Sequence, residues 1–192
     1  MAEWCIYNRE RITGMRVVEL GSGAGLVGLT CYKLCQPSFV TLTDYHPRVL
    51  ETLRYNLVSN ITSTADHQRG IEIQPLDWIE FSKDGSSSLP ADVVLASGKT
   101  DLNKLRYLIK CMLISSNYAC FLDVVYDADL IPGLVGTLTK LLDGSNNRQK
   151  LPIASIVACT ERNEETLERF LSELGKSHIK NRLTPFHFYT TM

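Results

Sequence analysis

Short apolar runs alternate with helical hydrophobic patterns along the chain. Four runs rich in aliphatic residues stop at or next to glycine, aspartate or serine, which predicts strands over residues 17–20, 39–43, 71–76 and 91–97. Apolar residues at three- and four-residue spacing predict helices over 26–34, 49–57 and 130–142. This alternation favours an α/β fold with a Rossmann-like, doubly wound and mostly parallel sheet that carries helices on both faces. We expect residues 1–192 to form a single domain.

A glycine pattern separates the first predicted strand from the first predicted helix. Gly21, Gly23 and Gly25 occupy alternate positions. Glycines at this spacing let the backbone turn sharply and let a ligand reach main-chain atoms that a Cβ would block. The start of the helix adds free N–H groups and a favourable field for polar ligand groups. The sequence therefore predicts a nucleotide-like cofactor at the first strand-to-helix turn of the sheet.

Two classes of cofactor fit this turn. The stretch from Gly23 to Gly28 satisfies the dinucleotide pattern G-x-G-x-x-G, and Asp44 follows at a suitable distance. Glu19, two residues before Gly21, argues instead for S-adenosylmethionine. A carboxylate would repel a pyrophosphate, whereas it would attract a sulfonium and an α-ammonium group. A dinucleotide-dependent oxidoreductase remains the less favoured alternative.

Acidic, aromatic and small residues end the next three predicted strands. Asp44 ends the second strand, where a carboxylate can accept hydrogen bonds from two ribose hydroxyls or can cap the following helix. Asp77 and Trp78 follow the third strand and suit an adenine, because the ring stacks on the base and the carboxylate accepts from its amine; simple packing explains Trp78 equally well. Ser97 ends the fourth strand and leaves room beside a methyl donor.

A family resemblance rests on motifs at 19–26, at Asp44, at 76–78 (Leu-Asp-Trp) and at 123–126 (Asp-Val-Val-Tyr). With these motifs the chain resembles the family 16 seven-strand protein-lysine methyltransferases, which are class I enzymes dependent on S-adenosyl-L-methionine. Within that family it is most similar to the members that act on eukaryotic elongation factor 2. The resemblance implies cofactor contacts at nine residues: Glu19, Gly21, Ser22, Gly23, Gly25, Asp44, Asp77, Trp78 and Ser97.

The same resemblance implies the chemistry and the partner. Asp123 and Tyr126 match the family motif that faces the substrate lysine, where a carboxylate and a phenol can bind the ammonium group and orient the amine after proton loss. Methyl transfer from a sulfonium then depends mainly on positioning the neutral amine. A helix cap for Asp123 and simple packing for Tyr126 are the structural alternatives. The implied substrate is elongation factor 2, and a catalytically inactive fragment is the alternative function.

Residues 98–122 interrupt the family pattern, which joins the fourth strand directly to Asp123. The segment holds four basic residues against one acidic residue and two of the six cysteines. Helical spacing is shared by five of its apolar residues: Leu102, Leu105, Ile109, Met112 and Leu113. It can be a lid or a substrate-binding helix, a tolerated surface insertion, or a translated intron. We favour the intron, because removing these residues restores the family motif without a gap.

The resemblance also implies that the family pattern extends beyond both ends of this sequence. In the family, a tryptophan that covers the cofactor precedes the first strand, and Trp4 matches a later tryptophan. Residues 179–192 can begin a further strand, but the hairpin that closes a seven-strand sheet is not recognisable in them. We therefore expect a fold that is incomplete at both ends.

Composition and charge favour a soluble intracellular protein. The net charge of −1 gives no strong attraction to nucleic acid or anionic membranes, and no apolar stretch is long enough to span a bilayer. The six cysteines show no C-x-x-C spacing, which favours buried thiols over a metal site and suits a reducing compartment. We expect a cytoplasmic monomer that binds no metal, nucleic acid or membrane.

Overall fold

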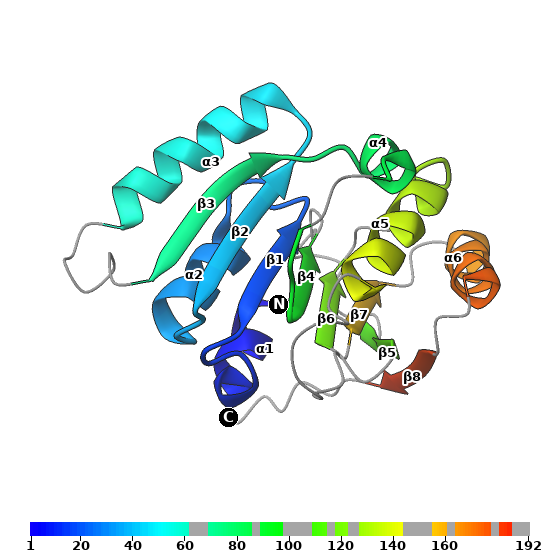
Figure 1. Ribbon diagram of the computed structural model, residues 1–192. Helices are drawn as coiled ribbons and strands as arrows, with labels where there is room; N and C mark the ends of the chain where they lie inside the picture. The colour runs from blue at the N-terminus through cyan, green and yellow to red at the C-terminus, as the bar shows by residue number, and fades with distance from the viewer. Residues whose placement is uncertain are drawn as a thin grey trace.

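The computed structural model describes residues 1–61, 69–85, 89–97, 109–114, 118–122, 127–143, 155–160, 164–177 and 181–185. Its eight-stranded sheet has the order β3-β2-β1-β4-β6-β7-β5-β8 (Figure 1). The first four strands along the chain are mutually parallel neighbours: β1 (Arg16–Leu20), β2 (Phe39–Asp44), β3 (Gly70–Pro75) and β4 (Val93–Ser97). Because they are parallel, their carboxyl ends meet at one edge of the sheet. The predicted α/β class and the four predicted strands are confirmed.

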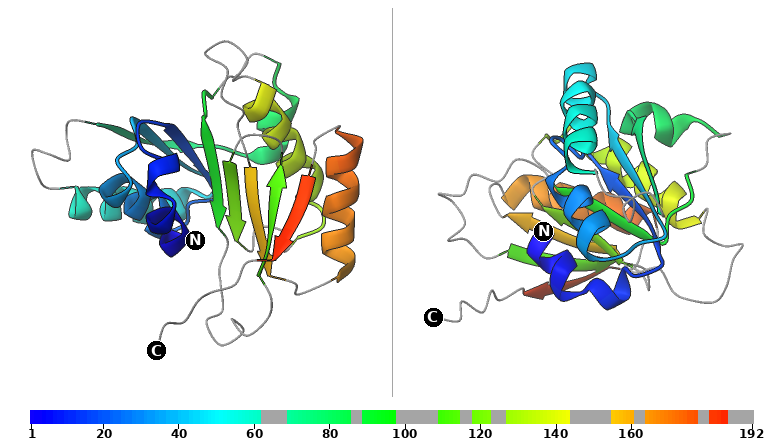
Figure 2. Two further views of the ribbon diagram at one scale, coloured as in Figure 1. Left: turned by 90° about the horizontal axis from the view of Figure 1, so that it is seen from below. Right: turned by 90° about the vertical axis from the view of Figure 1, so that its left-hand side faces the viewer.

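Helices cover both faces of this sheet (Figure 2). On one side lie α1 (Ala2–Tyr7), the short 3₁₀ turn η1 (Arg9–Arg11), α2 (Leu26–Leu34) and α3 (Pro47–Asn60), and on the other lie α4 (Trp78–Lys83), α5 (Ile131–Asp143) and α6 (Glu164–Lys176). Each face of the sheet packs on its own hydrophobic core. Side chains alternate along a strand, so Val17 of β1 packs in the core under α2 and Val18 packs in the core under α5. Within the described part of the chain, no helix has both the length and the apolarity needed to cross a membrane.

Three cysteines lie in the first of these cores. Cys5 of α1, Cys31 of α2 and Cys35 at the end of α2 are buried free thiols. The Cys35 thiol donates to the Cys5 carbonyl at 3.3 Å, which ties the two helices together. The prediction of buried thiols is confirmed for these three residues.

Two strands fall inside residues 98–122. β5 (Ile109–Ile114) pairs antiparallel with β7 (Ser155–Thr160), and β6 (Tyr118–Leu122) lies between β4 and β7, parallel to both. The helical interpretation is therefore wrong over 109–114, because a continuous apolar run also suits a strand and β7 supplies its partner. A surface insertion does not describe 118–122 either, since β6 is an inner strand between β4 and β7. β8 (Asn181–Pro185) pairs antiparallel with β5, so residues 179–192 do contain a strand.

An ion pair joins the amino ends of β1 and β4. Arg16 Nη2 lies 2.6 Å from Asp92 Oδ1, and Arg16 Nε donates to Asp92 Oδ2 at 2.9 Å. These hydrogen bonds hold the pKa of Asp92 below its usual value, outweighing the opposing effect of burial. The pair is partly exposed, so its contribution to stability is modest.

We expect Asp92→Asn to lower the free energy of unfolding by about 1 kcal/mol at pH 7. Because the folded-state pKa of Asp92 is lowered, this stabilisation is complete above the ordinary aspartate pKa of the unfolded chain. It is lost as the pH falls below about 4 and through the folded-state value. Urea unfolding of the wild type and the variant should therefore give converging stabilities on acidification, and a difference that stays constant would contradict the ion pair.

Candidate functional site

The loop after β1 has the left-handed backbone that its glycines permit. Gly21 and Gly23 have φ values of +64° and +56°, which other L residues rarely adopt. Ser22 between them is buried and ties the loop to β2: its N–H donates to the Thr43 carbonyl at 2.7 Å, and its hydroxyl accepts from the Thr43 N–H at 3.1 Å. The loop is therefore fixed against β2, and the Ser22 hydroxyl serves that attachment.

Glu19 lies beneath this loop. Its side chain is 0% exposed, and Oε2 accepts a hydrogen bond from the Gly28 N–H at 3.1 Å in the first turn of α2. A carboxylate beside the first N–H groups of a helix is electrostatically favourable. A Cβ at Gly28 would lie 2.5 Å from the same oxygen, so the contact requires glycine there. Glu19 thus joins β1 to α2 from inside the core, and its predicted contact with the cofactor stays a prediction.

Asp44 connects the loop to α3. Its Oδ2 accepts from the Gly23 N–H at 3.2 Å, and its Oδ1 accepts from the His46 N–H at 3.1 Å. His46 is the N-cap residue of α3, so the alternative role of Asp44 as the helix cap is wrong. The half-buried carboxylate lies beside the glycine loop, which is the position that a ribose contact requires.

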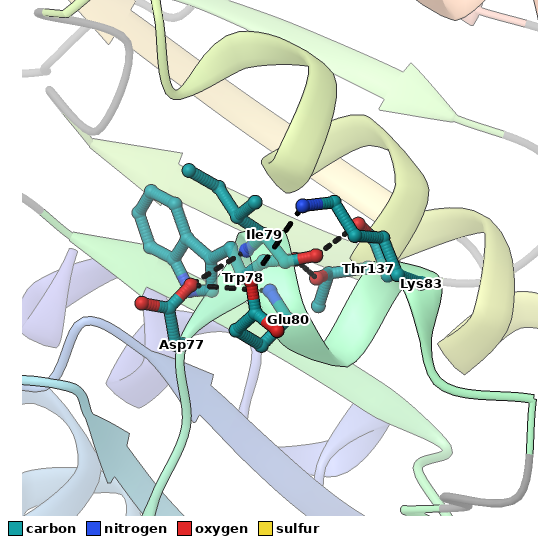
Figure 3. A network of polar contacts seen from close by, with 7 residues as sticks. Asp77, Trp78, Ile79, Glu80, Lys83 and Thr137 are labelled. Carbon is teal, nitrogen blue, oxygen red and sulfur yellow. Dashed lines mark hydrogen bonds and ion pairs between the residues drawn. The ribbon is translucent and has the colours of Figure 1, made fainter.

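Asp77 and Trp78 begin α4 directly after β3 (Figure 3). The exposed Asp77 is the N-cap: its Oδ1 accepts from the Ile79 N–H at 2.8 Å and from the Glu80 N–H at 3.3 Å. Trp78 is partly buried against the core under α5, as the packing alternative predicted. A Cβ at Gly21 would lie 3.4 Å from the Trp78 ring. Trp78 therefore both packs on the core and reaches the glycine loop.

The remaining predicted residues belong to β4 and to the segment after β6. Ser97 is the last residue of β4, next to β1. Asp123 and Tyr126 lie outside the described residues. Leu122, the last residue of β6, pairs with Ser97, so β6 ends at the edge of the sheet that carries the glycine loop.

Three contacts around the site were missed by the sequence analysis. Each is a side-chain donor that holds a backbone carbonyl: Thr43 Oγ1 on Glu19 at 2.7 Å, Asn56 Nδ2 on Ala24 at 2.8 Å, and Thr137 Oγ1 on Trp78 at 3.0 Å. A threonine within an apolar stretch is a usable sequence signal of a buried hydroxyl. Thr43 and Thr137 both fit it, and both are 0% exposed. Asn56 carries no such signal, because a half-buried polar residue in a helix does not reveal its partner.

This edge of the sheet has the chemistry of a nucleoside site. Asp44 and Asp77 supply carboxylates, which accept hydrogen bonds from hydroxyls and amines and repel phosphates. Space beside the loop is open at Gly23, where a Cβ would meet no atom within 4 Å. The geometry favours a nucleoside with hydroxyl, amine and cationic groups over a pyrophosphate-containing dinucleotide.

Comparison with known proteins assigns this site to a family. Residues 3–117 match the lysine methyltransferase family. The chain belongs to this family. The matched residues include the glycine loop, Asp44, Asp77, Trp78 and Ser97, so the family pattern covers every predicted cofactor contact.

Named relatives extend the match beyond this region. The chain is 34% identical to human protein-lysine N-methyltransferase EEF2KMT over 97% of its own length and 50% of that protein. It is 28% identical to protein-lysine N-methyltransferase EFM3 of Chaetomium thermophilum over 92% of its length and 44% of that protein. The chain therefore spans about half the length of the curated relatives it matches.

A solved structure shows the same fold. The crystal structure of a Methanococcus maripaludis protein described as an S-adenosyl-L-methionine-dependent methyltransferase aligns with this chain at a TM-score of 0.50 and 16% identity. The alignment covers 91% of this chain and 61% of that one. The class I fold and the family imply S-adenosyl-L-methionine as the cofactor. The open side of Gly23, the Trp78 ring beside Gly21 and the half-buried carboxylate of Asp44 fit that molecule.

Proposed function

We propose that this chain transfers methyl groups from S-adenosyl-L-methionine to a lysine of a protein. The observation that carries the proposal is the convergence of the glycine loop, Asp44 and Trp78 at the carboxyl edge of adjacent parallel strands. Family membership supports the reaction class. Elongation factor 2 is the substrate we propose, because the motifs resemble those of family members that act on it and human EEF2KMT is a relative.

The described residues divide the work of binding. The bound cofactor supplies a methyl group on a positively charged sulfur. Asp44, oriented by the Gly23 and His46 N–H groups, would accept hydrogen bonds from the ribose hydroxyls. Trp78 would flank the adenine, and Asp77 would accept from the adenine amine through the oxygen that does not cap α4. Glu19 supports the glycine loop from inside the core, because its hydrogen bond from the Gly28 N–H fixes the turn into α2.

Asp123 and Tyr126 are the proposed catalytic pair, which binds the lysine and orients its amine. We expect Asp123→Ala to lower kcat/KM for methylation of purified elongation factor 2 by about 100-fold or more, since a positioned acid–base group contributes at least that much. The affinity for the cofactor should stay unchanged. Transfer of a labelled methyl group measures the first quantity and calorimetric titration the second.

Asp127→Ala is the matched control for this experiment. Asp127 lies four residues away and its carboxylate accepts from the Asp129 N–H in an exposed turn, so its loss should leave methylation near the wild-type rate. Full methylation by the Asp123→Ala variant would exclude the proposed catalytic role. A wild-type chain that binds the cofactor but methylates no elongation factor 2 would favour the inactive fragment.

We further propose that the cofactor site does not depend on residues 98–122. Every contact described above for the loop, Asp44 and Trp78 is made by residues outside that segment. β6 and β7 run parallel to β4, so β7 can pair with β4 without a reversal once β6 is removed. We expect the chain lacking 98–122 to bind S-adenosyl-L-methionine within about threefold of the full chain in a calorimetric titration, a difference below 1 kcal/mol. The deletion also removes β5, the partner of β7 and β8, so loss of binding would mean that the sheet needs β5 or β6.

A further inference from the structure

One face of α5 is shaped to hold α4. Gly133 and Gly136 lie on that face, and a Cβ at either would collide with α4: at 3.0 Å from the Ile79 nitrogen and at 2.7 Å from Ser82 Cβ. Glycine is unfavourable inside a helix, so its presence at two positions on the contact face marks a close approach. The two helices therefore pack with their backbones in near contact.

Side chains of α5 also hold both ends of α4. Thr137 Oγ1 donates to the Trp78 carbonyl at 3.0 Å, in the first residue of α4 (Figure 3). Lys140 Nζ donates to the Phe81 carbonyl at 2.6 Å and to the Asp84 carbonyl, where a cation suits the end of a helix. α4 has only six residues, and a helix of that length owes its stability to tertiary contacts.

Thr137 contacts Trp78, the residue whose ring lies beside the glycine loop. Trp78 is held through its carbonyl by Thr137, and its ring lies beside Gly21. Thr137 is 0% exposed, so its hydroxyl is away from solvent and needs a partner within the protein, which the Trp78 carbonyl supplies. A shift of the Trp78 backbone would therefore move the ring relative to the loop.

We propose that Thr137 is a positioning residue for the cofactor: it fixes the Trp78 backbone and so sets the placement of the indole ring that flanks the adenine. Thr137 itself does not touch the cofactor. The proposal rests on the proposed function where it names S-adenosyl-L-methionine as the ligand. The placement of Trp78 by Thr137 can be measured without any ligand.

Trp78 fluorescence provides that measurement. The chain has two tryptophans, and Trp4 belongs to the other core cluster, so Trp4→Phe leaves Trp78 as the single indole reporter. In this background we expect Thr137→Val to increase acrylamide quenching of Trp78. We also expect it to weaken S-adenosyl-L-methionine binding by about 3- to 10-fold, the value of one buried hydrogen bond. Thr137→Ser keeps the hydroxyl and should restore both readouts.

Thr139→Val is the matched control. Thr139 lies on the same helix, but its hydroxyl donates to the Val135 carbonyl of α5 itself. If the two hydroxyls only stabilised the fold, the two valine variants would show similar losses of thermal stability and no change in quenching or affinity. Equal quenching and equal affinity in the two variants, or failure of Thr137→Ser to restore them, would overturn the proposal.

Gly133→Ala keeps the proposal testable if Thr137→Val folds poorly. Its Cβ would press on the Ile79 backbone next to Trp78, so we expect more quenching and binding weakened at least about fivefold, although alanine favours the helix. Unchanged quenching and affinity in this variant would also overturn the proposal. If the wild-type chain fails to bind S-adenosyl-L-methionine, the proposed function fails, whereas the quenching comparison still decides whether Thr137 positions Trp78.

Discussion

Gly28→Ala should destabilise the protein by about 3 kcal/mol, because the new methyl group has no space and breaks a buried hydrogen bond. Its Cβ would lie 2.2 Å from Leu42 Cδ2 and 2.5 Å from Glu19 Oε2. Both side chains are 0% exposed, so neither can turn out to solvent. The better helix propensity of alanine recovers at most about 1 kcal/mol of the loss. For a chain of this size, the expected fall in Tm is roughly 6–12 °C.

Gly175→Ala is the control for this substitution. Gly175 also lies in a helix, α6, but a Cβ there would meet no atom within 4 Å. The same change should therefore be neutral or stabilising by some tenths of a kcal/mol. Calorimetric melting of the two variants gives the comparison. A Gly28→Ala variant as stable as the wild type would show that the Glu19 carboxylate does not lie against the start of α2.

Sequence patterns were sufficient where local chemistry and burial agree. The strand 39–43, its terminal Asp44 and the helix 26–34 follow from apolar runs bounded by turn residues, and tertiary contacts do not alter them. The apolar run at 109–114 behaves differently, because its spacing suits a helix or a strand. Pairing with β7, more than forty residues later, makes it a strand.

The sequence indicated which residue types gather at this edge of the sheet, but not the contacts that connect them. The sequence singled out Glu19 as a cofactor contact, which stays a prediction, and its spacing of nine residues from Gly28 does not reveal the hydrogen bond across the turn. Thr137 and Trp78 are 59 residues apart in sequence, and their contact depends on how α4 packs on α5. A pattern along the chain can indicate which groups bind a ligand, whereas the contacts that hold them require the fold.

Asp44→Ala should weaken S-adenosyl-L-methionine binding by about 100-fold while changing stability little. The carboxylate makes two hydrogen bonds to backbone N–H groups, with Gly23 at 3.2 Å and His46 at 3.1 Å, and these fix its orientation at the glycine loop. Hydrogen bonds to a charged group are worth about 1.5–3 kcal/mol each, so loss of the bonds proposed from the two ribose hydroxyls corresponds to about two orders of magnitude in Kd. The site is half-buried, so the freed N–H groups can bind water in the unliganded protein.

The comparison of Kd with Tm makes this prediction specific. Asp44→Asn retains the shape and one acceptor oxygen, so it should bind the cofactor with intermediate affinity, and its Tm should resemble that of Asp44→Ala. Calorimetric titration and thermal melting of the three proteins give both quantities. Equal affinity in all three would remove Asp44 from the cofactor site. A large fall in Tm with no separate change in affinity would instead assign the carboxylate to fixing the loop, because the protein would then depend on its bonds to Gly23 and His46 even without a ligand.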